Sequence, residues 1–200
     1  MEVSTWVYSV TLGSLTNGPG RRNILHVTGC SIHCPGCFSK HTWKPKSGTL
    51  IHNQELATQL LQQDPEGISI SGGEPLDQSS SLLDLLERLP RNLPKGILLY
   101  TGTNTIQRKQ NPLWPRIAAL IDVAVAGPYD MQNAINPVKD LRSSHNQRVL
   151  LLSNKLREKD LTSLPSVEYL IGTNGMTLMG FPGATDVGNQ KAVSTTSEGH

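Results

Sequence analysis

Residues 17–43, NGPGRRNILHVTGCSIHCPGCFSKHTW, contain all three cysteines of this 200-residue chain: Cys30, Cys34 and Cys37. Their C-x3-C-x2-C spacing follows an apolar run, and an Asn-Gly-Pro-Gly turn opens the stretch. Three thiolates on one short loop can bind three corners of an iron–sulfur cube and leave the fourth iron without a protein ligand. An open metal position distinguishes reactive metal sites from purely structural ones. The stretch therefore predicts a metal loop with room for one further ligand.

Three kinds of site compete for this loop. A redox C-x-x-C pair could use Cys34 and Cys37, but it would leave Cys30 unexplained. A zinc site could recruit His33 or His41 as its fourth ligand, although structural zinc sites usually pair two short knuckles and this chain has one. The third kind is a 4Fe-4S cluster with one open iron, and the spacing favours it.

The bulk properties describe an ordinary globular chain. A net charge of +2 and a pI near 8.5 are too mild to predict binding to nucleic acid or to a membrane surface. No apolar run approaches the ~20 residues that a membrane span needs. The amino-terminal residues lack the features of a signal peptide, and the clustered cysteines do not suit a disulfide-bonded secreted protein. We expect a cytoplasmic protein with one domain over residues 1–182 and a disordered tail over residues 183–200.

Short apolar segments alternate with helical patterns along the chain. Strands are expected at 7–12, 24–27, 68–71, 97–100, 122–126, 148–152 and 167–171. Helices are expected at 54–63, at 113–121, over a leucine stripe at 82–89, and more weakly at 156–164. Asp77 or Ser79 is expected to cap the leucine-rich helix. This alternation predicts an α/β fold with parallel strands and crossover helices.

Distinctive residues follow four of the expected strands. They are the cysteine loop, Gly72, Gly102 and Gly127. Ligand sites in parallel α/β folds gather at the carboxyl ends of the strands, so these points should share one rim. Residues 72–75, Gly-Gly-Glu-Pro, could be a plain turn before a helix, or could offer backbone groups and a carboxylate to the ammonium and carboxyl groups of a ligand.

The combination of motifs resembles the radical S-adenosylmethionine enzymes. The resemblance rests on the C-x3-C-x2-C loop and on residues 71–75, Ser-Gly-Gly-Glu-Pro, one strand later. More narrowly, the chain is similar to the activating proteins of the anaerobic ribonucleotide reductase over about residues 6–152. The segments that carry this likeness are NGPG at 17–20, CPGC at 34–37, TW at 42–43 and NQR at 146–148.

The resemblance implies a fold, a chemistry and partners. The fold would be an incomplete, TIM-like α/β barrel carrying a single 4Fe-4S cluster, ligated by Cys30, Cys34 and Cys37. Its open iron would bind S-adenosylmethionine, which is reductively cleaved to methionine and a 5′-deoxyadenosyl radical. The radical would take a hydrogen atom from a glycine of a large glycyl-radical subunit, and a flavodoxin or ferredoxin would supply the electron. The residues implied in cofactor binding are Gly36, Cys37, Phe38, Ser71, Gly72, Gly73, Glu74 and Thr101.

Two departures from the family pattern fall on the side expected to face the substrate. Ala126 precedes Gly127 where an acid is common, and His145 interrupts a loop that usually reads Arg-Gly-Ser-Ser-Asn-Gln. They do not fall on the cluster, and they leave open a radical enzyme that modifies a peptide or small molecule directly. A separate alternative, of another class, is a non-catalytic metal-binding or electron-transfer module.

Overall fold

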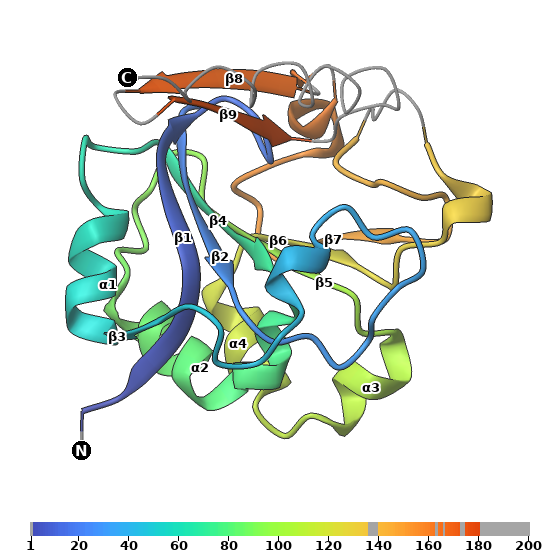
Figure 1. The fold of residues 1–200 in the computed structure, drawn as a ribbon, viewed down its shortest axis with the longest axis horizontal. Coiled ribbons are helices and arrows are strands. Elements are labelled where there is room, and N and C mark those ends of the chain that lie inside the picture. The colour runs from blue at the N-terminus through green and yellow to red at the C-terminus, as the bar shows by residue number, and fades with distance from the viewer. Residues whose placement is uncertain (1, 136–139, 163, 166, 173–174, 181–200) are drawn as a thin grey trace, which may run out of the picture.

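The computed structural model describes residues 2–135, 140–162, 164–165, 167–172 and 175–180 of a mixed α/β fold (Figure 1). The strands are β1 (Ser4–Ser14), β2 (Arg22–Val27), β3 (Thr49–His52), β4 (Gly67–Gly72), β5 (Ile97–Thr101), β6 (Val123–Ala126), β7 (Arg148–Leu151), β8 (Val167–Gly172) and β9 (Gly175–Gly180). The α-helices are α1 (Asn53–Leu60), α2 (Ser79–Arg88), α3 (Thr105–Gln110) and α4 (Trp114–Leu120). Short 3-10 helices are η1 (Lys40–Thr42), η2 (Pro75–Gln78), η3 (Met131–Asn133) and η4 (Glu158–Leu161). The tail predicted at 183–200 lies outside the described residues.

A seven-stranded sheet in the order β3-β1-β2-β4-β5-β6-β7 forms the centre of the fold. The pairs β2–β4, β4–β5 and β5–β6 are parallel, as the sequence predicts. The outer pairs β1–β3, β1–β2 and β6–β7 are antiparallel, so the expectation of an entirely parallel sheet was wrong at both edges. The physical reason is the connection between the strands: among the described residues no α-helix lies between β1 and β2 or between β6 and β7, and strands joined without a crossover helix pair antiparallel.

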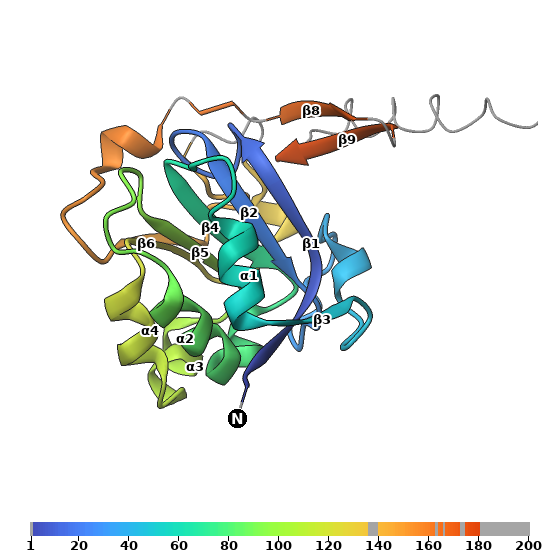
Figure 2. The same ribbon diagram turned by 90° about the vertical axis from the view of Figure 1, so that its left-hand side faces the viewer.

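Helices α1, α2 and α4 lie side by side on one face of the sheet (Figures 1 and 2). The predicted leucine stripe forms α2, where Leu82, Leu83, Leu85 and Leu86 are buried. They pack with strand residues such as Ile68 in the main hydrophobic core. Each such side chain contributes roughly 2 kcal/mol when removed from water. A second cluster, which includes Leu98 and Leu141, is separate from this core.

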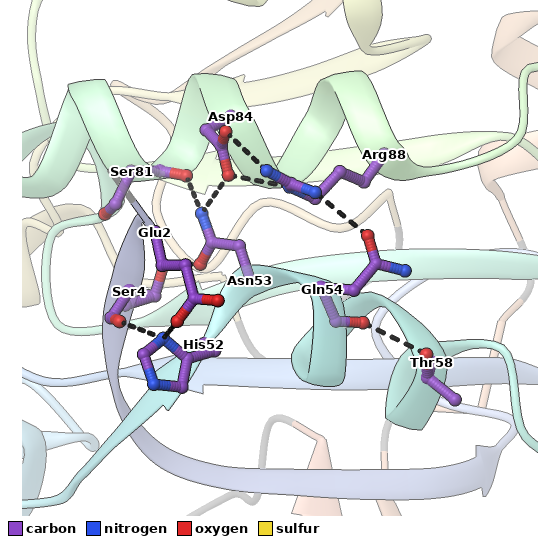
Figure 3. A network of polar contacts seen from close by, with 10 residues as sticks. Glu2, Ser4, His52, Asn53, Gln54, Thr58, Ser81, Asp84 and Arg88 are labelled. Atoms are coloured by element: carbon purple, nitrogen blue, oxygen red, sulfur yellow. Dashed lines mark hydrogen bonds and ion pairs between the residues drawn. The ribbon is translucent and has the colours of Figure 1, made fainter.

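A buried amide joins the first helices to the amino-terminal strand (Figure 3). The Asn53 side chain accepts a hydrogen bond from the Thr5 hydroxyl at 2.7 Å and donates to the Ser81 carbonyl and the Asp84 carboxylate, both at 2.8 Å. Arg88 binds the same carboxylate through Nε at 2.8 Å. Because Asn53 has no exposed surface, these bonds are needed to satisfy its polar atoms.

A fully buried arginine closes the end of the sheet where β2 and β4 begin. The Arg22 guanidinium donates to the Ser69 hydroxyl and to the carbonyls of Pro19, Ile68, Lys95 and Gly96, over 2.7–3.0 Å. Burial lowers its pKa to about 10. At the same end the Glu168 carboxylate of β8 accepts from the Leu15 amide at 2.7 Å, which ties the β8–β9 hairpin to the turn between β1 and β2.

Two strands and one α-helix were not predicted, and the length of one predicted helix was overestimated. Strand β3 and helix α3 carry no regular apolar pattern, and β9 follows the strand that was expected to be the last one. The helix predicted at 156–164 is only the four-residue η4. Among the described residues, no helix has the length and apolar character to cross a membrane.

Candidate iron–sulfur site

The predicted motifs meet at one rim of the sheet. The cysteine loop follows β2, Gly72 ends β4, Thr101 ends β5 and Ala126 ends β6. These four strands are consecutive neighbours in the sheet, and all run parallel. Their carboxyl ends therefore lie next to one another, as the sequence predicts.

Backbone and side-chain bonds hold the cysteine loop at both ends. The Gly29 and Cys30 amides donate to the carbonyls of Thr42 and Trp43 at 2.8 and 3.1 Å. The Asp77 carboxylate accepts from the Ser31 amide at 2.7 Å and from its hydroxyl at 2.8 Å. The prediction that Asp77 or Ser79 caps the leucine-rich helix was therefore wrong. The N-cap of α2 is Gln78, and Asp77 holds the cysteine loop instead.

The glycine pair after β4 packs directly against the base of the cysteine loop. The Gly73 amide donates to the Val27 carbonyl at 2.9 Å, and the Glu74 amide donates to the Gly29 carbonyl at 2.7 Å. A Cβ on Gly73 would lie 2.0 Å from the Gly29 oxygen, which leaves no space for any side chain. The amides of Gly73 and Glu74 are thus occupied within the protein, and the sequence-based expectation that they stand exposed for a ligand needs this correction.

The Glu74 carboxylate is buried and links two loops of the rim. Its oxygens accept hydrogen bonds from the Leu76 amide at 2.8 Å, the Thr101 hydroxyl at 2.8 Å and the Gly102 amide at 2.7 Å. Only 1% of the residue is exposed. Burial raises the pKa of Glu74 to about 7, and the three donors oppose that rise. The carboxylate therefore fixes the ends of β4 and β5 relative to each other.

The three thiols are close to one another and partly exposed. Burial raises the pKa of Cys30 and Cys34, while amide donors, Ile32 and His33 for Cys30, partly oppose the rise. In a 4Fe-4S cluster each thiolate binds a different iron, so the sulfur atoms need to be near one another without meeting at one point. Cys34 interacts electrostatically with both Cys30 and Cys37. Three partly exposed free thiols on one short loop are the donor set that a cluster with one open iron needs.

The two histidines considered as zinc ligands contact aromatic rings. The His33 ring lies 4.7 Å from that of Trp43, and the His41 ring lies 4.7 Å from that of Tyr8. Each contact packs one histidine of residues 17–43 against an aromatic side chain. Of the implied cofactor-binding residues on the loop itself, Phe38 is about half exposed, and Gly36 has a positive φ of 76°.

Sequence reasoning did not find the contacts between the loop after β6 and the cysteine loop. The backbone of Tyr129 opposes the rise that burial causes in the pKa of Cys34, and the Met131 side chain lies against Gly36. No residue-type pattern signals contacts of this kind. Ala126 is buried at the end of β6, where it pairs with Arg148, and His145 is exposed. Helix α3, at the same rim, has a recognisable signal in its Asn104–Gln107 capping box.

Comparisons with known proteins agree with this site. A family model described as a 4Fe-4S single cluster domain matches residues 16–150. The anaerobic ribonucleoside-triphosphate reductase-activating protein of Escherichia coli K12 is 34% identical over 143 residues, which cover 68% of this chain and 91% of that protein. The proteins of the same name from phage T4 and Vibrio cholerae are 34% and 33% identical, over 66% of this chain and 85% and 89% of theirs. The chain therefore belongs to the 4Fe-4S single cluster domain family, among the anaerobic ribonucleoside-triphosphate reductase-activating proteins.

Proposed function

We propose that this protein is a radical S-adenosylmethionine enzyme that installs a glycyl radical on the large subunit of an anaerobic ribonucleotide reductase. Its relatives are named as activating proteins of that reductase. The observation that carries the proposal is the packing of the Cys30–Cys37 loop against the Gly72–Glu74 turn on one rim. This arrangement holds the cysteine loop directly beside the Gly-Gly-Glu turn.

The cluster would be ligated by Cys30, Cys34 and Cys37. When loaded and reduced, it supplies the electron that cleaves S-adenosylmethionine to methionine and a 5′-deoxyadenosyl radical. The protein's part is to bind and orient that ligand and to exclude water from it.

The ligand would contact two segments of the chain. Backbone oxygens of Ser71, Gly72 and Gly73 would accept from the methionine ammonium, because the neighbouring amides are already bonded within the protein. The buried Glu74 carboxylate, braced by Thr101, would add negative charge behind that ammonium. Backbone over residues 36–38, Gly36 to Phe38, would meet the adenine.

The same proposal includes the barrel architecture, the domain bounds, the electron donor and the cellular location. The seven-stranded sheet would be the incomplete barrel of the radical enzymes, formed by one domain over residues 1–182 with a tail over 183–200. Its electron donor would be a low-potential protein such as a flavodoxin or ferredoxin. The enzyme would work in the anaerobic, reducing cytoplasm, without nucleic acid or membrane as a partner.

Anaerobic reconstitution tests the proposal. The protein should bind ~4 irons with broad visible absorption, and reduction with dithionite in the presence of S-adenosylmethionine should release 5′-deoxyadenosine. One zinc per chain, or a cluster that releases no 5′-deoxyadenosine, would contradict it. The second outcome would favour an electron-transfer module. Cleavage without a radical on the large subunit would instead favour an enzyme that modifies a peptide or small molecule.

A further inference from the structure

Positive charge is concentrated in the part of the chain that contains the cysteine loop. Residues 3–54 have five lysines and arginines and no aspartate or glutamate, although the whole chain has 18 basic and 16 acidic residues. Three of the five, Lys40, Lys44 and Lys46, come shortly after the last cysteine, and we name residues 40–48 the lysine segment. All three are exposed, and none forms an ion pair with a residue that the structure describes. The mild net charge of the chain thus conceals a basic segment.

The lysine segment is hydrogen-bonded to the base of the cysteine loop. The Gly29 amide donates to the Thr42 carbonyl at 2.8 Å. The Cys30 amide donates to the Trp43 carbonyl at 3.1 Å. Thr42 has no exposed surface, and Lys40 Nζ lies 5.9 Å from the centre of the Trp43 ring. The backbone of the segment is therefore one hydrogen bond away from a candidate cluster ligand.

The segment lies on the side of the sheet away from helices α1, α2 and α4, where Figure 2 shows it in light blue. There the His41 ring of η1 is 4.7 Å from the Tyr8 ring of β1. Leu50 of β3 pairs with Trp6, two residues before Tyr8, so Leu50 and Tyr8 share one face of the sheet. Tyr8 is 48% exposed and Leu50 is 51% exposed. Exposed apolar side chains with charged neighbours are the arrangement found at protein–protein interfaces.

The charges around the cysteine loop divide between its two sides. In the order β3-β1-β2-β4-β5-β6-β7, the lysine segment leads into β3, at one edge of the sheet. Three acidic residues of the site lie beyond β2: Glu74 and Asp77 follow β4, and Asp130 follows β6. A negatively charged partner is therefore attracted to the β3 side of the loop. A partner bound there leaves the rim over β4, β5 and β6 to the ligand and the large subunit.

We propose that Lys40, Lys44 and Lys46, with Tyr8 and Leu50, form the docking surface for a small acidic electron-carrier protein. The carrier, a low-potential one-electron donor, loses one electron and the cluster gains it, and no proton moves. Complementary charge mainly raises the rate of encounter, and the interfaces of redox partners are small, so the carrier can leave after each electron. The inference rests on the proposed function, because it assumes a cluster on the cysteine loop. It gives the electron donor of that function a surface and a charge.

Charge reversal tests the docking surface. Lys44→Glu/Lys46→Glu inverts two of its charges and leaves Lys40 beside Trp43. The control, Lys109→Glu/Lys159→Glu, changes the net charge equally at two exposed lysines of α3 and η4 that form no ion pair among the described residues.

Stopped-flow absorption then measures how fast each reconstituted cluster is reduced. One reductant is a reduced flavodoxin of low pI, and the other is photoreduced deazaflavin, a small molecule that needs no docking surface. At low ionic strength, flavodoxin should reduce the Lys44→Glu/Lys46→Glu protein about tenfold more slowly than the wild type, because electrostatic steering is lost. The control variant should match the wild type with flavodoxin, and all three proteins should react equally with deazaflavin.

Salt separates the loss of steering from a loss of structure. At about 1 M salt, charges are screened beyond roughly 3 Å. Flavodoxin should then reduce the wild type and the Lys44→Glu/Lys46→Glu protein at similar rates. Equal flavodoxin rates for these two proteins at low salt, or an equal slowing of the control variant, would overturn the docking surface.

The failure of each proposal gives a different result. Cluster reduction needs neither S-adenosylmethionine nor the large subunit, so a wild-type cluster that cleaves no S-adenosylmethionine contradicts the proposed function while the lysine variants still decide the docking surface. A wild-type protein that binds no cluster contradicts both. If the Lys44→Glu/Lys46→Glu protein is reduced normally by flavodoxin, yet installs less glycyl radical with deazaflavin as the reductant, the surface binds the large subunit and the electron-carrier proposal is wrong.

Discussion

The amide of Glu74 donates to the carbonyl of Gly29 at 2.7 Å, one residue before the first cysteine. This bond joins two loops that are 45 residues apart in the chain but leave neighbouring parallel strands, β2 and β4. Because the loops share it, the cysteine loop and the Gly-Gly-Glu turn form one structural unit. A substitution that moves the backbone of one loop should therefore also move the backbone of the other.

Gly73→Ala tests this unit. The added methyl group would lie 2.0 Å from the Gly29 oxygen, so the backbone of one loop must move. We expect a loss of about 1–3 kcal/mol in the free energy of unfolding, as overpacking generally costs, together with reduced iron uptake. Urea unfolding and iron analysis measure both, with Ser80→Ala on the exposed side of α2 as the control. A Gly73→Ala protein with normal stability and full iron content would contradict the close packing described here.

Asp77→Ala should loosen the cysteine loop without unfolding the protein. It removes two hydrogen bonds to Ser31. Since both residues are exposed, their joint contribution is only about 1 kcal/mol. Iron release from the cluster to a chelator should then be about fivefold faster. Glu158→Ala removes an exposed carboxylate elsewhere and should leave the rate unchanged. Equal rates in both variants would mean that Asp77 does not hold the loop.

Glu74 should make the stability of the cluster-free protein depend on pH. Its pKa rises from 4.5 to about 7 on folding, mainly through burial. Between these values the folded state keeps a proton that the unfolded state has lost, so stability falls as the pH rises through this window. The loss is at most about 3 kcal/mol. Glu74→Gln lacks a titrating group and should lose less between pH 5 and pH 8 in urea unfolding. Identical pH profiles would show that Glu74 does not titrate in this range.

Cys34→Ala should abolish the cluster and the cleavage of S-adenosylmethionine together. The variant loses one of the three thiols that would ligate the cluster. Iron content, visible absorption and 5′-deoxyadenosine measure the effect, and Met131→Ala, which leaves all three thiols in place, is the control. A Cys34→Ala protein that keeps a full cluster would exclude Cys34 as a ligand.

The sequence predicted the rim of the site better than the edges of the sheet. The cysteine spacing and the residues after β2, β4, β5 and β6 were enough to place the motifs together, because parallel strands end on the same side. The antiparallel edges escaped prediction, because an apolar pattern can locate a strand such as β1 or β7 without showing the direction in which it pairs, and Thr49–His52 carries no alternation at all. Local pattern cannot reveal a partner that is distant in sequence.

The bonds inside the site were also beyond the sequence. Asp77 was expected to cap a helix, a role that its residue type suits equally well, and only the fold brings Ser31 within its reach. The approach of a ligand to the glycines at 72 and 73 stays a prediction, and the structure adds that both pack closely against the protein's own backbone. The contact between Met131 and Gly36 could not be found either, because local pattern does not reveal a partner that is distant in sequence.

The most direct test of the proposed function is an EPR measurement on the large subunit of the partner reductase. After anaerobic incubation with the reconstituted protein, S-adenosylmethionine and a reductant, that subunit should carry a glycyl radical, and the Cys34→Ala protein should give none. A cluster-bearing protein that cleaves S-adenosylmethionine but leaves the subunit without the radical would contradict the activating role.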